Sequence, residues 1–100
     1  MRVAERNRAI KKALRRHFRN VRVRGDRGTG YGWVTITIRE PRDHECDGDW
    51  RCQRCNEQVM EIKRKVWGIL RETGLINYLY TYYDDMNERR YECTVEVKLF

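Results

Sequence analysis

The stretch HECDGDWRCQRC, residues 44–55, divides the chain into two halves that share one pattern. Three of the four cysteines and one of the two histidines fall within it. A helical pattern and two strand patterns precede the stretch, and a longer helical pattern and two more strand patterns follow it. The predicted order of elements is therefore α-β-β-α-β-β, with a cysteine-rich loop at 42–55 between the halves.

The first half begins with a predicted amphipathic helix over residues 3–18. Its apolar side chains recur at helical spacing and would form one buried stripe: Val3, Ile10, Leu14 and Phe18. Residues 21–24 and 33–39 alternate apolar and polar side chains, which is typical of half-buried strands. The glycine-rich segment 25–32 leads into a strand and not into a helix, so we interpret it as a hairpin connection rather than a phosphate-binding loop.

The second half begins with a predicted helix that Asn56 caps, that runs to Thr73 and that Gly74 ends. Residues 75–83 are rich in tyrosine and predict a third strand. Residues 91–99 alternate strictly and predict a fourth strand. Its inward side chains would be Tyr91, Cys93, Val95, Val97 and Leu99.

These elements predict an α+β fold in which one domain covers residues 1–100 as a two-layer sandwich. We expect a mainly antiparallel four-stranded sheet with both helices on one face. The open face would carry arginine, threonine and aromatic side chains: Arg22, Arg24, Trp33, Thr35, Thr37 and Arg39, with Tyr78, Tyr80 and Tyr82 as further candidates. Bases can stack on such a surface. Ordinary cross-strand pairing explains the pattern more simply, and Glu92 and Glu96 on the same face weigh against nucleic acid.

The cysteine-rich stretch has the ligand types and spacing of a structural zinc site. Such sites use four Cys or His ligands in a tetrahedron, commonly with a Cys-x2-Cys knuckle at the start of a helix. Cys52 and Cys55 have that spacing and precede the second predicted helix, while His44 and Cys46 lie upstream on a glycine-containing loop. We predict that these four residues bind zinc. Cys93 would replace His44 only if its strand ran beside the loop.

Two other interpretations of the cysteines stay open. A Cys-x-x-Cys pair that leads into a helix, here Cys52 and Cys55, is also typical of thiol oxidoreductases, because a helix N-terminus lowers a thiol pKa. The element order lacks the β-α-β unit that such enzymes use. Alternatively, the cysteines bind nothing. A zinc deaminase is excluded by the motif spacing, and the absence of serine excludes serine nucleophiles, so we assign no catalytic residue.

Positive charge is concentrated in the first quarter of the chain. Residues 1–24 carry ten Lys/Arg and one acidic residue, whereas residues 25–100 carry twelve Lys/Arg and fourteen acidic residues. A local basic surface favours a polyanion, so we predict non-specific nucleic-acid binding through the first helix. The predicted contacts are Lys11, Lys12, Arg15, Arg16, Arg19, Arg22 and Arg24. The alternatives are an acidic protein partner and a merely solvated helix face.

The N-terminus lacks the apolar run of a signal peptide, and no window of the sequence is long and apolar enough to span a membrane. We therefore expect a cytoplasmic protein with reduced cysteines and no membrane partner, a setting in which metal binding is favoured over disulfides. No motif indicates a small-molecule substrate.

A resemblance covers most of the chain. The segments 10–18, 21–23 and 32–38, together with the Tyr/Asp-rich segment 82–86 and the strand pattern at 95–97, resemble a small domain of large polyvalent proteins of phages and mobile elements. The resemblance implies an α+β module associated with mobile elements and of unassigned role. The cysteine-rich loop is not part of the pattern of that family, so no site residue is carried over.

Overall fold

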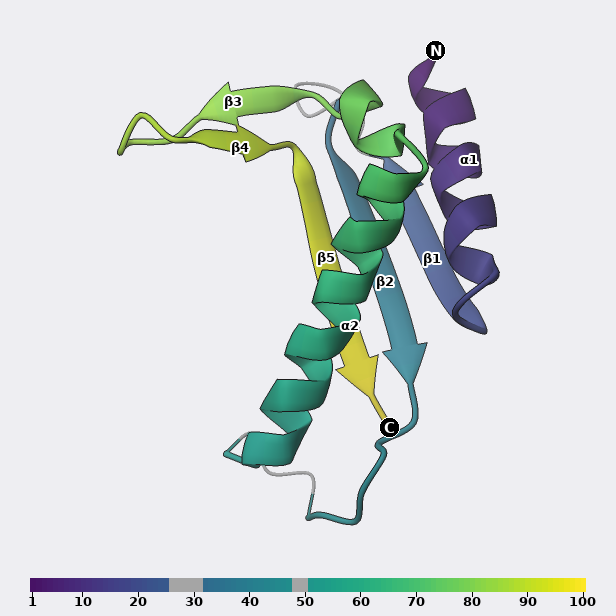
Figure 1. Cartoon of the computed structure of the whole chain (residues 1–100), viewed down its shortest axis with the longest axis vertical. Helices are drawn as coiled ribbons and strands as arrows, with labels where there is room; N and C mark the ends of the chain where they lie inside the picture. The colour runs from purple at the N-terminus through teal and green to yellow at the C-terminus, as the bar shows by residue number, and fades with distance from the viewer. Residues whose placement is uncertain (26–31, 48–50) are drawn as a thin grey trace.

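The central strand of the fold is β2 (Val34–Glu40), whose alternating valine, isoleucine and threonine side chains suit a half-buried pleated surface. The computed structural model describes residues 1–25, 32–47 and 51–100 (Figure 1). The predicted hairpin connection at 25–32 and the centre of the cysteine-rich loop thus fall largely outside the described residues. β1 (Asn20–Gly25) pairs with β2 in antiparallel orientation, and Val23 faces Ile36 in that register.

The other neighbour of β2 is β5 (Cys93–Leu99), which runs parallel to it with Val34 opposite Cys93 and Ile38 opposite Val97. The strand order is β1-β2-β5. Parallel neighbours need a crossover connection, and here the crossover contains α2 (Gln53–Glu72). The elements β2, α2 and β5 therefore form a β-α-β unit, and the prediction that the chain lacks one is wrong. The helix carries the chain back along the sheet, so that β5 starts at the same end as β2 (Figure 1).

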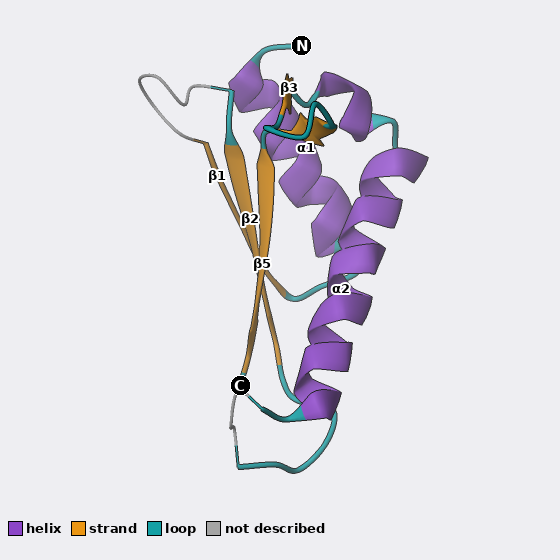
Figure 2. Cartoon of the chain, turned by 90° about the vertical axis from the view of Figure 1, so that its left-hand side faces the viewer, coloured by secondary structure: helices purple, strands orange, loops and turns teal. Residues whose placement is uncertain are grey.

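Both helices, α1 (Val3–Arg15) and α2, cover one face of this sheet, as predicted (Figure 2). The core lies between the two layers and includes Ile10 and Leu14 of α1, Val66 and Leu70 of α2, and Ile36 of β2, all fully buried. The outer side chains of α1 and α2 are polar, which accounts for their amphipathic sequences. The α+β class and the element order are therefore confirmed in outline.

The predicted four-stranded, mainly antiparallel sheet is wrong. The described strands form a three-stranded mixed sheet and a separate two-stranded ribbon of β3 (Thr81–Tyr83) and β4 (Arg89–Tyr91). The predicted fourth strand is divided at Glu92, whose backbone N–H donates to Tyr80 O at 2.8 Å. β4 therefore pairs with β3 in a hairpin that extends away from the sheet, while β5 pairs with β2 (Figure 1).

The predicted strand over residues 75–83 is also mostly wrong. Gly74 adopts a left-handed conformation with φ 75°, as expected for a residue that ends a helix, and the chain then turns into a short 3-10 helix, η2 (Leu75–Tyr78). Leu75 and Leu79 are buried in the core, so this segment closes the end of the sandwich instead of extending the sheet. In the described part of the chain, neither helix has the combination of length and apolarity that crossing a membrane requires.

A buried arginine ties this end of the fold together. Arg6 of α1 is only 1% exposed, and its guanidinium donates to Gly32 O at 3.3 Å and to Tyr78 O at 3.4 Å. It also lies 5.7 Å from the centre of the Tyr80 ring. Burial lowers the pKa of Arg6 from its ordinary value, and the carbonyl acceptors and the ring offset the cost of removing the charge from water.

Candidate metal centre

The ligands come from the first turn of α2 and from the loop that follows β2. Cys52 is the N-cap of α2 and Cys55 lies in its first turn. The N-cap thus lies four residues before the predicted cap, Asn56, whose backbone N–H instead donates to Cys52 O at 3.2 Å. A Cys-x2-Cys pair wound into the start of a helix brings both thiols to one side of that turn.

The loop is held against the helix by Gln58. This side chain is 7% exposed; its amide nitrogen donates to Pro41 O at 3.0 Å, and its carbonyl oxygen accepts from the backbone N–H of Asp43 at 3.2 Å. A buried amide is stabilised only when its hydrogen-bonding groups are satisfied, and this one is satisfied by the loop backbone. The two hydrogen bonds thereby fix the position of the loop backbone from which the His44 side chain projects.

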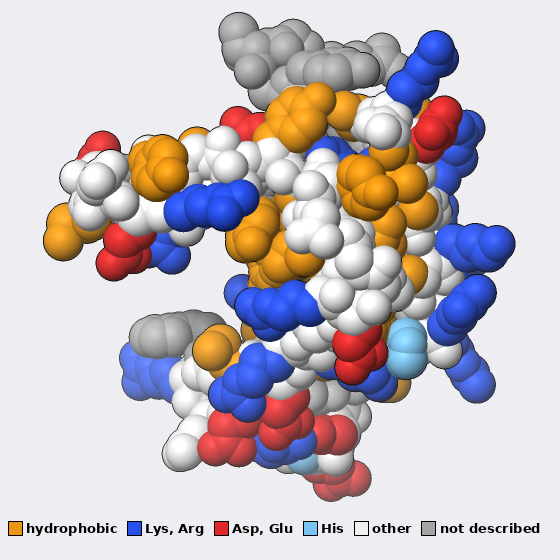
Figure 3. Space-filling model, turned by 45° about the horizontal axis from the view of Figure 1, so that its top comes forward, with side chains coloured by type: hydrophobic (Ala, Val, Ile, Leu, Met, Phe, Trp, Pro, Cys, Tyr) orange, Lys and Arg blue, Asp and Glu red, His pale blue; other side chains and the backbone are white. Residues whose placement is uncertain are grey.

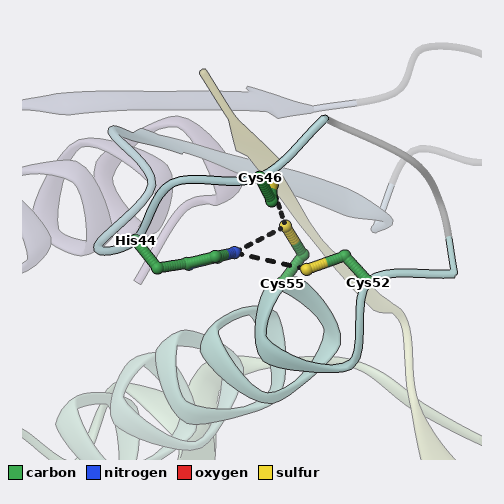
Figure 4. A group of neighbouring side chains, drawn as sticks. All are labelled: His44, Cys46, Cys52 and Cys55. Atoms are coloured by element: carbon green, nitrogen blue, oxygen red, sulfur yellow. Dashed lines mark hydrogen bonds between the residues drawn. The ribbon is translucent and has the colours of Figure 1, made fainter.

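Four potential ligand atoms meet at this point (Figure 4). His44 Nε2 lies 3.3 Å from the sulfur atoms of both Cys52 and Cys55, and the Cys46 sulfur lies 3.5 Å from that of Cys55. All four atoms lie within 4.8 Å of one another. A tetrahedral site with Zn–S bonds of about 2.3 Å and a Zn–N bond of about 2.0 Å has ligand atoms roughly 3.5–3.8 Å apart. The four residues are therefore close enough to hold a metal ion.

The imidazole is oriented by a carboxylate. Asp43 Oδ1 lies 2.8 Å from His44 Nδ1, while Nε2 points between the sulfur atoms (Figure 4). Metal-binding histidines commonly donate their second ring N–H to such a group, which fixes the tautomer and the ring plane. Arg54 pairs with Asp43 in turn, and this guanidinium and the imidazole together hold the pKa of Asp43 at about 2. The same carboxylate raises the pKa of His44, with a smaller contribution from Cys52.

The thiols of the first turn differ in acidity. The backbone N–H of Cys55 and the imidazole of His44 stabilise the Cys52 thiolate and lower its pKa to about 7. Burial raises the pKa of Cys55. A thiolate is the form that binds metal, so one ligand is already close to its binding form at neutral pH. Within the described residues, which include all four cysteines, no disulfide is formed.

Cys93 is not a fourth ligand in place of His44. It is buried at the start of β5, opposite Val34 at the start of β2, whereas the ligand loop follows the other end of β2. Six residues of extended strand separate these ends, a distance of about 20 Å. The alternative ligand set is therefore excluded by the parallel pairing of the strands, and the set predicted from spacing is the one brought together.

The predicted nucleic-acid contacts are all exposed but divide into two groups. The five on or just after α1 lie on the solvent side of the helix layer, and Lys and Arg side chains line that side of the molecule (Figure 3): Lys11, Lys12, Arg15, Arg16 and Arg19. Arg22 and Arg24 alternate with Val21 and Val23, which pack against the core, so they project from the opposite face of the sheet. Arg22 and Arg24 thus lie on the open face of the sheet, where the alternation of the strand placed them, and not beside the α1 contacts.

Sequence reasoning missed Asp43 and Gln58. Asp43 directly precedes His44, and a carboxylate next to a candidate histidine ligand is a usable signal. Gln58 occupies a position on the buried face of α2, four residues before Ile62, where a polar residue demands a partner. Arg6 was missed for the same reason, because it lies four residues before Ile10 on the buried stripe of α1.

Comparison with known proteins gives no relative from which a function can be transferred: no family model, no curated protein and no solved structure matches the chain.

Proposed function

We propose that this chain is a zinc-stabilised, non-catalytic binding protein whose ligand is nucleic acid. The zinc part is supported by one observation above all: three cysteine sulfurs and an imidazole nitrogen converge within 4.8 Å, and the imidazole is oriented by Asp43. Thiolate and imidazole ligands in a tetrahedral arrangement favour zinc among the divalent metals. In such a set every tetrahedral position is taken by protein, which is the arrangement of structural and not of catalytic zinc.

A zinc ion here would lock the connection between the two layers. His44 and Cys46 belong to the loop that leaves β2, and Cys52 and Cys55 begin α2. A domain of this size buries a limited core, and a metal cross-link supplies folding free energy that the core lacks. The role of the site is therefore to hold α2 in place on the sheet.

The binding part rests on the charge of α1. Its solvent side presents cations on successive turns, and no Asp or Glu follows Glu5 within residues 1–24. Phosphate contacts from such a helix would dominate the affinity, so binding would be weakly specific and would weaken as salt is raised. The contacts are Lys11, Lys12, Arg15, Arg16 and Arg19.

Metal content and thiol reactivity test the zinc proposal. Protein purified without chelator should contain one zinc per chain, and Cys46, Cys52 and Cys55 should react with a thiol reagent only after a chelator is added. Metal-free protein whose thiols react at once would overturn it. If the thiols are free, an assay of insulin reduction decides whether Cys52 and Cys55 act as a redox pair.

Charge reversal tests the nucleic-acid proposal. Arg15→Glu combined with Arg16→Glu should weaken binding to both DNA and RNA, and should flatten its salt dependence. Arg64→Glu with Arg71→Glu on exposed positions of α2 is the matched control, because it changes the net charge equally. Unchanged binding in the α1 variant would count against α1 as the contact surface. A pull-down that survives nuclease and high salt would favour an acidic protein partner.

A further inference from the structure

The face of the sheet opposite the helices is open and hollow. No helix of the described residues covers it (Figure 2). A concavity of about 870 Å³ lies on this face, between the β1 edge and β5. Its charged lining residues are four cations and one acid: Arg22, Arg24, Arg39, Lys98 and Glu96.

The strand register sets these cations in rows across the sheet. One row is Asn20, Arg39 and Lys98; the next is Arg22, Thr37 and Glu96. A third row places Thr35 beside Arg24. Alternate residues on a strand are about 7 Å apart and neighbouring strands about 4.8 Å apart. Cations thus flank Thr35 and Thr37 on the β1 side and at the Arg39 end, whereas Glu96 lies beside Thr37 on β5. Threonine hydroxyls are hydrogen-bond donors as well as acceptors.

The cations lack counter-ions in the described structure. Across residues 1–25, 32–47 and 51–100, Arg22, Arg24 and Lys98 form no ion pair. The Arg39 guanidinium lies over the Phe100 ring, 5.7 Å from the ring centre. The four cations outnumber the one acidic residue of the concavity, Glu96. Like charges on one face of a sheet repel, so the excess of positive charge favours the binding of an anion there.

An aromatic pair lies at one end of the same face. Trp33 precedes Thr35 by two residues, and its indole N–H donates to Thr94 Oγ1 at 3.0 Å, which places the indole on the open side of the sheet. The Tyr82 ring lies against it, with centroids 5.7 Å apart and an interplanar angle of 34°. Tyr82 is 38% exposed, so part of its surface is free to take a further ring.

We infer that the open sheet face binds single-stranded nucleic acid. Its phosphates would lie over Arg22, Arg24, Arg39 and Lys98, and a base would stack at the Trp33–Tyr82 pair. Unpaired bases can reach a ring, whereas the bases of a duplex are stacked on one another and expose only their edges. This inference rests on the proposed function and adds to it a second surface, on the other side of the molecule from α1, and a preference for single strands.

The test is a titration of a labelled single-stranded oligouridylate, and of a DNA duplex of the same length, at several salt concentrations. Arg22→Gln with Arg24→Gln should weaken binding of the single strand more than Arg15→Gln with Arg16→Gln does. The slope of log K against log salt should become shallower by about 0.7 for each phosphate that the variant no longer neutralises. Arg64→Gln with Arg71→Gln removes the same charge from α2. This control should change neither the single-strand affinity nor the salt slope. Thermal unfolding of each variant checks its fold.

Tyr82→Ala separates stacking from charge. It should weaken single-strand binding by about 5- to 150-fold at every salt concentration, with the salt slope and duplex binding unchanged. Tyr83→Ala is the matched control, because Tyr83 is 69% exposed and forms no ring pair within the described residues. Equal losses of affinity in both tyrosine variants would show that no base stacks at the Trp33–Tyr82 pair.

The outcomes separate this inference from the proposed function. If binding occurs and only the α1 variant weakens it, the inference is wrong and the proposed function stands. Duplex affinity equal to single-strand affinity in the wild type would also overturn the inference alone. No binding of either nucleic acid would overturn both. Displacement of the oligouridylate by polyglutamate as readily as by unlabelled RNA would identify the face as a site for an acidic polypeptide instead.

Discussion

The Nδ1 atom of His44 lies 2.8 Å from a carboxylate oxygen of Asp43, while the other ring nitrogen, Nε2, faces the sulfur atoms of Cys52 and Cys55. The carboxylate is itself held by Arg54. The orientation of one candidate ligand therefore depends on a residue outside the cluster. This relationship allows the metal centre to be tested without removing a ligand.

We expect Asp43→Asn to weaken zinc binding by about 10- to 100-fold, because the asparagine leaves the imidazole less firmly oriented and less basic. A competition titration against a chromophoric chelator measures this affinity. Glu45→Gln is the matched control, since it removes an exposed carboxylate from the same loop and should leave the affinity unchanged. Equal affinities in wild type and Asp43→Asn would show that the carboxylate does not support the ligand.

Gly32 is required by the close approach of Tyr80. A Cβ atom at position 32 would lie 1.9 Å from a carbon of the Tyr80 ring, so the ring would have to leave Arg6. We expect Gly32→Ala to destabilise the fold by about 1–3 kcal/mol, measured by denaturant unfolding. In a Tyr80→Ala background the same change should cost much less, which a double-mutant cycle measures.

Gly68 provides the opposite control. An added Cβ at this position of α2 meets no atom within 4 Å, so Gly68→Ala should stabilise the protein by about 0.5–1 kcal/mol through helix propensity. A Gly32→Ala variant as stable as Gly68→Ala would contradict the packing of Tyr80 on the backbone.

The sequence predicted the elements better than their pairing. The alternation at 91–99 identifies inward Cys93 and Val95 correctly, but alternation is the same in parallel and antiparallel strands. Which neighbour β5 takes is decided by α2, whose crossover returns the chain to the start of β2. Residues 75–83 have the composition of a strand, yet the left-handed Gly74 and the burial of Leu75 turn the chain into η2.

The cluster of candidate metal ligands could be predicted because its signal is local. Cys52 and Cys55 carry it in their spacing, and His44 and Cys46 lie a few residues away. Gln58 acts through hydrogen bonds to a backbone fifteen and seventeen residues distant, which no local pattern encodes. The separation of Arg22 and Arg24 from the α1 cations is, by contrast, a local signal, because the two arginines alternate with the core-facing Val21 and Val23.

Among the cations of α1, Arg6 should contribute most to the stability of the fold. Arg6→Ala would leave the carbonyls of Gly32 and Tyr78 without this donor and would remove packing against Tyr80, so we expect a loss of about 2–4 kcal/mol in the free energy of unfolding. Arg8→Ala, at an exposed position two residues on, should change it by less than about 0.5 kcal/mol. Comparable losses of stability in the two variants would contradict the buried guanidinium.

Cys93 should be an unreactive thiol in the folded protein. Its burial should also make the free energy of unfolding decrease with pH in the alkaline range. Burial raises the pKa of Cys93 from 9.0 to about 11, and the charge of Arg6 opposes that rise. The thiol should therefore resist alkylation at neutral pH until the protein unfolds. Because the folded pKa lies above the unfolded one, the stabilising contribution is complete below about pH 9 and is lost as the pH rises toward 11. The melting temperature of wild type should fall more steeply over that range than that of Cys93→Ala, and parallel curves would show that the thiol does not titrate with folding.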